Sequence, residues 1–156
     1  MIRRLYDILS SPALSLVLRL FLGAMFLYAG SVKMIDPAGF AKAVANYQIL
    51  PGYLASIVAV VLPPTEILVA LSLLLGWWIK GGAFLATGLQ GIFSVALVLS
   101  LIRGLNIDCG CFSTSPGVGT ITWTYLIRDY LLMAGSLQIL FFDSRYGSIG
   151  RSFRLK

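Results

Sequence analysis

The sequence predicts an all-α, polytopic membrane protein, in which one domain over residues 1–156 forms a bundle of four transmembrane helices. Of the 156 residues, 58% are hydrophobic and 12% are charged, whereas a soluble domain carries about 25% charged residues. Four apolar runs, at about 12–30, 55–78, 82–102 and 124–142, each approach the ~20 residues that span a bilayer core. The 16 glycines agree with this class, because glycine is frequent in membrane helices.

The first apolar run begins with the signals of a helix start. Pro12 suits the first turn, and Ser10 or Ser11 can cap it. A cleaved signal peptide is the alternative, because a basic lead precedes the apolar residues. Since Arg19 lies inside the run and the run is long for a signal core, we expect a retained transmembrane helix.

The first connection, residues 31–52, predicts a short interfacial helix between the first two spans. Asp36–Pro37 starts it, and Phe40, Val44 and Tyr47 follow at i, i+4 and i+7. This spacing gives one apolar face, which is typical of a helix lying on a membrane surface.

The second run carries a proline pair, Pro63 and Pro64, which predicts a kink. Trp77 and Trp78 end this run with the aromatic residues that favour a membrane interface. A tight link at Lys80–Gly82 then leads into the third run.

The basic residues predict the orientation in the membrane. If both termini share one side, that side holds seven of the 12 lysines and arginines, and the other side holds Lys33, Lys42, Arg103 and Arg128, with Arg19 inside the membrane. The positive-inside rule then places both termini in the cytoplasm and the last loop in the periplasm of a bacterial inner membrane. The net charge of +6 indicates no nucleic-acid partner, because the basic residues flank apolar runs.

Three polar side chains are expected at one depth inside the bundle. Counted from the outer ends of their runs, Arg19, Glu66 and Gln90 lie roughly 16–18 Å below the outer surface. Gln90 also belongs to a polar stripe with Thr87 and Ser94. If the cluster is functional, it forms a proton path or a pocket for a small head group such as a quinone. If it is structural, Arg19 and Glu66 form an ion pair that is hydrogen-bonded to Gln90.

The loop between the third and fourth runs holds both cysteines of the chain, Cys109 and Cys111, on either side of Gly110. They complete no zinc site, because zinc takes four ligands and the chain has no histidine; with Asp108 a dimer would still be needed. A disulfide is feasible if the chain turns at Gly110. Its small ring would be strained and reducible, which indicates exchange chemistry.

Charged residues near this loop are candidates for support. Arg103 or Arg128 would favour a cysteine thiolate, whereas Asp108 would disfavour one at Cys109. The alternative for Arg128 is an anchor on lipid phosphate or on the loop. Asp129 suits the start of the fourth helix electrostatically.

The four spans, residues 18–51 (LRLFLGAMFLYAGSVKMIDPAGFAKAVANYQILP), the charged second span and the CGCFS loop resemble the MauE branch of the DoxX-like membrane proteins. The resemblance covers residues 12–142. It implies a four-helix bundle tied to thiol–disulfide chemistry outside the cytoplasm, as in maturation of the disulfide-rich small subunit of methylamine dehydrogenase. Carried over to this chain, Cys109 and Cys111 become the redox pair, and polar family positions without an assigned role are Arg19, Lys33, Asp36, Pro37 and Glu66.

The predicted function is therefore thiol–disulfide redox chemistry at the membrane. One cysteine pair is half of a relay, so a periplasmic thioredoxin-like or disulfide-containing protein, or a membrane redox complex, is the expected partner. The electrons would pass to that partner or to a quinone, the cofactor that this chemistry suggests. The alternatives are a small non-catalytic subunit or assembly factor of a larger membrane complex, and a transporter that couples ions through Arg19 and Glu66.

Overall fold

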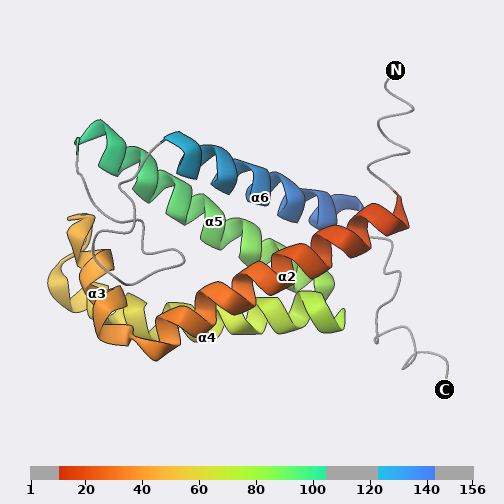
Figure 1. Cartoon of the computed structure of the whole chain (residues 1–156), viewed down its shortest axis with the longest axis horizontal. Helices are drawn as coiled ribbons and strands as arrows, with labels where there is room; N and C mark the ends of the chain where they lie inside the picture. Colours follow the sequence, from red (N-terminus) through yellow and green to blue (C-terminus); the bar gives the residue numbers. More distant parts are fainter. Residues whose placement is uncertain (1–10, 105–122, 143–156) are drawn as a thin grey trace.

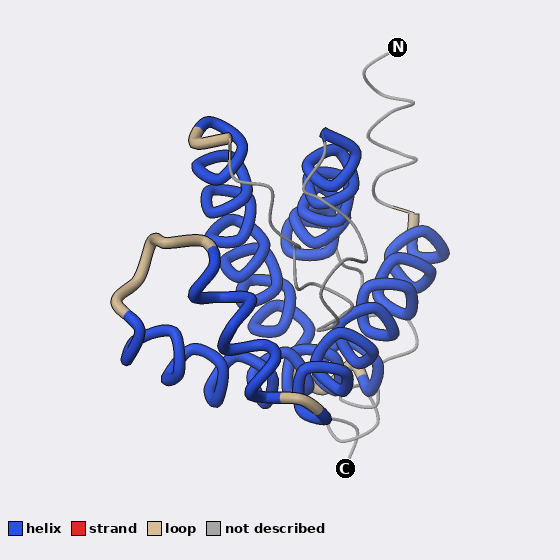
Figure 2. The backbone as a smooth tube through the Cα atoms, turned by 60° about the vertical axis from the view of Figure 1, so that its left-hand side comes forward, coloured by secondary structure: helices blue, strands red, loops and turns tan. Residues whose placement is uncertain are grey.

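The computed structural model describes residues 11–104 and 123–142, and the regular secondary structure in these ranges is helical (Figure 1). Figure 2 shows that only short loops separate the helices within residues 11–104. In chain order the helices are α2 (Pro12–Ile35), α3 (Pro37–Asn46), α4 (Gly52–Leu75), α5 (Ile79–Ile102) and α6 (Trp123–Phe142). The expected all-α class and the short helix between the first two long ones are confirmed.

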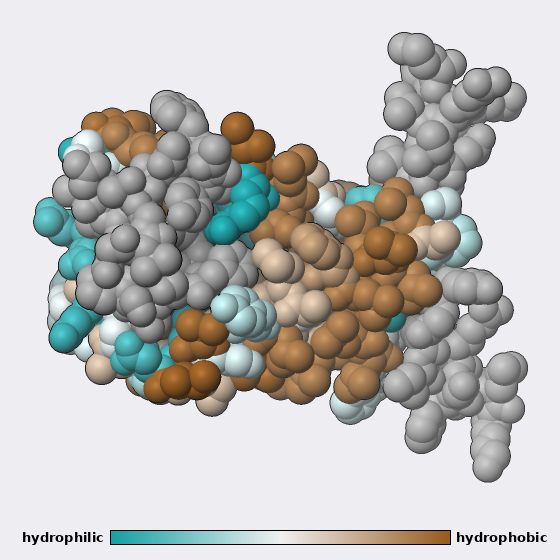
Figure 3. All heavy atoms as spheres, viewed as in Figure 1, coloured by the Kyte–Doolittle hydropathy of each residue, from teal (hydrophilic) through white to brown (hydrophobic). Residues whose placement is uncertain are grey.

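Three of the described helices, α2, α4 and α5, are long and apolar enough to cross a membrane. Their outward side chains include strongly exposed apolar residues such as Ile92 and Leu68. On the face in view in Figure 3, apolar surface covers most of the described part away from α3. Helix α6 covers the fourth expected span, but Arg128, Asp129 and Gln138 make its sequence less apolar. The chain is a multi-pass membrane protein, and the count of four spans stays a prediction.

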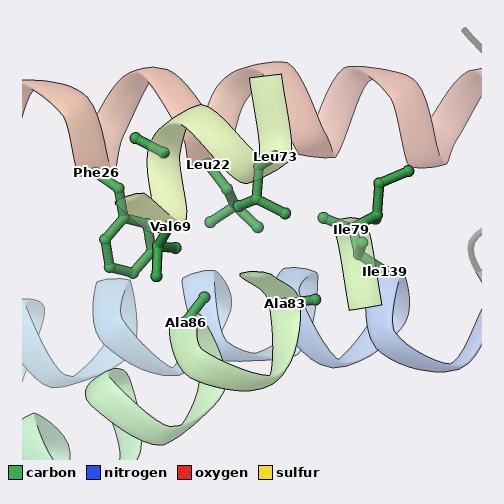
Figure 4. Close-up of a cluster of buried hydrophobic side chains, with 9 residues drawn as sticks. Leu22, Phe26, Val69, Leu73, Ile79, Ala83, Ala86 and Ile139 are labelled. Carbon is green, nitrogen blue, oxygen red and sulfur yellow. The ribbon is translucent and has the colours of Figure 1, made fainter. Parts of the chain in front are cut away.

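The long helices pack as two pairs, α2 with α4 and α5 with α6. The pairs meet in one apolar core (Figure 4), which consists of Leu22, Phe26, Val69, Ala70, Leu73, Ile79, Ala83, Ala86 and Ile139. From this core the pairs diverge toward the end of the bundle where α3 lies (Figure 1). A smaller cluster of Tyr47, Leu97 and Leu126 packs separately.

Two glycines set the close approach of α2 to α4. A Cβ atom at Gly23 would lie 2.7 Å from Leu74 Cγ, and one at Gly30 would lie 2.9 Å from Ile67 Cγ1. Both distances are shorter than real Cβ contacts, so larger residues would push the helices apart. Small residues at such positions let membrane helices pack backbone against backbone.

The helix starts follow the predicted signals. Ser11 Oγ accepts a hydrogen bond from the Leu14 amide at 3.3 Å, and Asp36 Oδ1 accepts one from the Gly39 amide at 2.8 Å. The apolar stripe of α3 faces protein, because Phe40 and Tyr47 are buried. That helix is therefore packed onto the bundle through the face that was expected to meet the membrane surface.

Several boundaries differ from the sequence prediction. Helix α2 continues past residue 30 to Ile35, so Lys33 lies inside the helix. Helix α4 stays helical through its two prolines and ends at Leu75, where Gly76 takes a left-handed φ of 68°. The predicted link at Lys80–Gly82 is wrong, because these residues lie in the first turn of α5. The left-handed Gly76 already provides the helix end, which makes the exposed pair Trp77–Trp78 the link.

Candidate functional site

A cavity of about 70 Å³ lies between the four long helices. Its apolar lining consists of Leu22, Met25, Phe26, Ala29, Leu62, Leu89, Phe93 and Leu132, and its polar lining consists of Lys33, Glu66, Gln90, Arg128 and Asp129. We call this the central cavity. A mostly apolar wall with a few convergent polar groups is typical of a functional pocket.

Lys33 and Glu66 form a buried ion pair in the wall of the central cavity. Lys33 Nζ lies 2.5 Å from Glu66 Oε1, and the two side chains are only 3% and 9% exposed. Lys33 Nζ also lies 5.0 Å from the centroid of the Phe40 ring, a distance at which an aromatic face attracts a cation. The other oxygen of the carboxylate, Glu66 Oε2, is buried and has no hydrogen-bond partner among the described residues.

The expected Arg19–Glu66 ion pair is wrong. Arg19 is buried, and its Nε donates a hydrogen bond at 3.2 Å to the carbonyl of Leu73, in the last turn of α4. Carbonyls in a last turn lack intrahelical donors and carry the negative end of the helix dipole, so a guanidinium stabilises them. Leu73 lies roughly 10 Å along α4 from Glu66, and Arg19 does not line the cavity.

The predicted polar stripe on α5 faces α6. Ser136 Oγ lies 3.0 Å from Gln90 Oε1 and 2.9 Å from Thr87 Oγ1, and Ser94 donates a hydrogen bond to the Asp129 carboxylate. Gln90 therefore bonds a serine of α6 and belongs to a polar α5–α6 contact. It still shares the cavity wall with Glu66, as the depth argument predicted.

The charge of Asp129 also affects Tyr47, which lies in the connection between α3 and α4. Tyr47, which caps the end of α3, is buried, and its ring packs edge to face on Phe93 with centroids 6.1 Å apart. Burial, together with the negative charge of Asp129, raises the pKa of Tyr47 above its usual value. Tyr47 thus connects the short helix to the cavity-lining helices α5 and α6.

The predicted supporting residues fall in different places. Arg128 lines the central cavity. Arg103 lies at the exposed end of α5, where its Nη1 donates a hydrogen bond at 3.1 Å to the carbonyl of Gln48 and ties α5 to the α3–α4 connection. Asp108, Cys109 and Cys111 lie outside the described residues.

Sequence reasoning gave Lys33 no role. Its position in the helix could have indicated one. Lys33 lies about one turn after Gly30, and a residue one turn beyond a close helix contact lies on the same face of the helix. A Cβ at Gly30 would lie 3.1 Å from the Pro63 carbonyl and 3.3 Å from Glu66 Cβ. Lys33, on the next turn of α2, consequently lies close to the Glu66 carboxylate.

The chemistry available in the described site is proton exchange and hydrogen bonding. The residues within 11–104 and 123–142 contain no group of three histidines, cysteines or carboxylates that could hold a metal ion. Two cationic and two acidic side chains line the cavity instead. These features define a multi-pass helical membrane protein with a charged cavity inside its bundle.

The comparisons with known proteins give the family. Residues 11–142 match the family model described as methylamine utilisation protein MauE, so the chain belongs to this family. MauE of Paracoccus denitrificans is 33% identical over 134 residues, which cover 85% of this chain and 72% of the relative. MauE of Methylophilus methylotrophus is 29% identical over 134 residues, covering 85% and 70% of the two chains. No solved structure matches the chain significantly.

Proposed function

We propose that this MauE-family protein carries out thiol–disulfide exchange at the periplasmic side of the bacterial inner membrane. Its Cys109–Gly110–Cys111 motif supports disulfide formation in a partner protein of methylamine utilisation, as in the maturation of methylamine dehydrogenase. Both termini lie in the cytoplasm under this proposal. The relatives bear the name of methylamine utilisation proteins, which supports the pathway.

The observation that carries the proposal is the position of the motif in the chain. The segment with both cysteines directly joins α5 to α6. These two helices supply Gln90, Arg128 and Asp129 to the central cavity. Cys109 lies seven residues after Ile102, the last residue of α5, so covalent geometry keeps it within ~25 Å of the end of that helix.

The proposed reaction moves two electrons. A partner thiolate attacks the Cys109–Cys111 disulfide and forms a mixed disulfide, and the released sulfur leaves as a thiolate. The second thiolate of the partner then attacks the mixed disulfide, which leaves the partner oxidised and this chain with two thiols. Two electrons and two protons have then passed to this chain. A quinone regenerates the disulfide and leaves as quinol, or a second redox protein takes the electrons.

Replacing both cysteines by serine tests the proposal. The double variant Cys109→Ser/Cys111→Ser should leave the partner's disulfides unformed, as measured by alkylation of free thiols in the periplasmic fraction. Ser113→Ala is the matched control, because it changes the same segment and keeps both thiols. Normal partner oxidation in the double variant would refute the redox function and favour an assembly factor that acts without thiol chemistry.

A single-cysteine variant identifies the partner. Cys111→Ser or Cys109→Ser leaves one thiol. This thiol attacks the disulfide of an oxidised partner in the reverse of the reaction above, and the variant has no second thiol to release the partner as a dithiol. One of the two variants should therefore retain a covalent partner on a non-reducing gel, and a reductant should release it. If neither variant retains one, direct exchange with a protein is refuted.

A further inference from the structure

We propose that the central cavity is a water-filled proton-exchange site, in which Glu66 binds and releases protons and Lys33 holds its carboxylate in place. The role of this site in turnover rests on the redox function proposed above. The site itself is inferred from α2, α4, α5 and α6.

The first step is the hydrogen-bonding state of Glu66. Its Oε1 holds the Lys33 ammonium at 2.5 Å, whereas Oε2 is buried and has no partner among the described residues. A carboxylate oxygen accepts hydrogen bonds from two directions, and a buried acceptor left without a donor is costly. Because Glu66 lines the central cavity, a donor within that cavity is the remaining partner for Oε2.

The cavity has room for water as that donor. Its volume is about 70 Å³, while a water molecule occupies about 30 Å³ in the liquid. The cavity can therefore hold about two water molecules.

The polar lining meets the second requirement for buried water, which is two to four hydrogen-bonding partners. The Lys33 ammonium has two N–H groups besides the one directed at Glu66, and Gln90 Nε2 and the Asp129 carboxylate belong to the same wall. Water in the cavity can donate to Glu66 Oε2 and accept from these N–H groups.

The charges around Glu66 allow it to change protonation state. The facing charged groups are Lys33 from α2, and Arg128 and Asp129 from α6, whereas α5 contributes the neutral Gln90. With all four groups ionised the charges cancel. A proton arriving through cavity water binds Oε2 and gives a neutral carboxyl group, and Lys33 keeps its ammonium.

Thiol oxidation coupled to the reduction of a quinone would use such a site. Each disulfide formed from two thiols releases two electrons and two protons, and each quinone reduced to quinol takes up two of each. Glu66 would pass these protons between water at the cysteine side and the membrane interior.

Infrared spectroscopy of the purified protein tests the site without any partner. Lowering the pH should produce a carboxyl C=O band that shifts within minutes in D₂O. The Glu66 component is the part of this absorption that is lost in Lys33→Gln/Glu66→Gln, a variant that removes both charges together and so leaves no buried charge unpaired. It should persist in Asp129→Asn, the control for the other cavity carboxylate.

Two results would overturn the proposal: a Glu66 component that resists D₂O for hours, and a carboxyl absorption that is unchanged in Lys33→Gln/Glu66→Gln. The Cys109→Ser/Cys111→Ser variant should retain the Glu66 band. The infrared test of the cavity therefore gives its answer even if the redox function is refuted. In the turnover experiment, Lys33→Gln/Glu66→Gln should slow partner oxidation at least tenfold, as measured by alkylation of free thiols in the periplasmic fraction. An unchanged rate in the charge-free variant would refute the role in turnover.

Discussion

Breaking the Lys33–Glu66 pair should cost much more stability than removing it whole. Both side chains are at least nine-tenths buried, so Lys33→Met leaves a carboxylate unpaired inside the bundle. Breaking such a pair typically costs about 3–5 kcal/mol, whereas replacing both charges by apolar residues is often neutral. We therefore expect Lys33→Met and Glu66→Met each to lose at least about 3 kcal/mol of unfolding free energy, and the double variant to lose less than either.

The assay is a double-mutant cycle on the purified protein in micelles, with unfolding free energies from reversible denaturation. The coupling energy should reach about 3 kcal/mol or more, far above the ~0.5 kcal/mol of independent sites. Lys42→Met is the matched control, because Lys42 lies exposed on α3 and exposed charges contribute little. Additive losses in the cycle would refute the buried pair, since additivity would mean that the two side chains do not meet.

The remaining predictions concern packing, helix termination and pH. Gly30→Ala should lose about 1–3 kcal/mol in the same unfolding assay, because its Cβ would lie 2.9 Å from Ile67 Cγ1; Gly88→Ala, whose Cβ meets nothing within 4 Å, should show no loss. Arg19→Met should lose about 2 kcal/mol by removing the hydrogen bond to the end of α4, and a smaller loss than in the control Lys42→Met would contradict that contact. Because the folded pKa of Tyr47 is raised, its contribution to stability is complete below the unfolded value near 10 and is lost as the pH rises further. Tyr47→Phe should flatten this alkaline loss in pH-dependent melts, and an unchanged slope would argue against it.

The sequence predicted the helices well because apolar runs and helix starts are local features. Ser11 and Pro12 mark the start of α2, and Asp36 and Pro37 mark the start of α3, as expected. Each signal involves residues within one turn of each other, so no knowledge of the other helices is needed. The family was also predicted from local segments and is confirmed.

The pairing of charges could not be predicted in the same way, because it depends on the register between helices. The first span was predicted to end at about residue 30, and Lys33 was placed outside the membrane. In the structure α2 continues through it, because Glu66 on α4 neutralises the ammonium inside the bundle. The predicted common depth of Arg19 and Glu66 also requires the outer ends of α2 and α4 to be level. Gly30 instead lies beside Pro63, so the first turns of α4, from Gly52 onward, extend beyond the end of α2.

The two buried charges of α2 have a consequence for biogenesis. Arg19 donates to Leu73, Lys33 pairs with Glu66, and both partners lie on α4. When α2 emerges from the ribosome, α4 has not yet emerged, and an unpaired charge such as Arg19 opposes insertion by about 2.5–3.5 kcal/mol at the centre of a helix. We expect α2 to remain at the translocon until α4 arrives, so that the two helices enter the lipid as a hairpin whose internal charges are already matched.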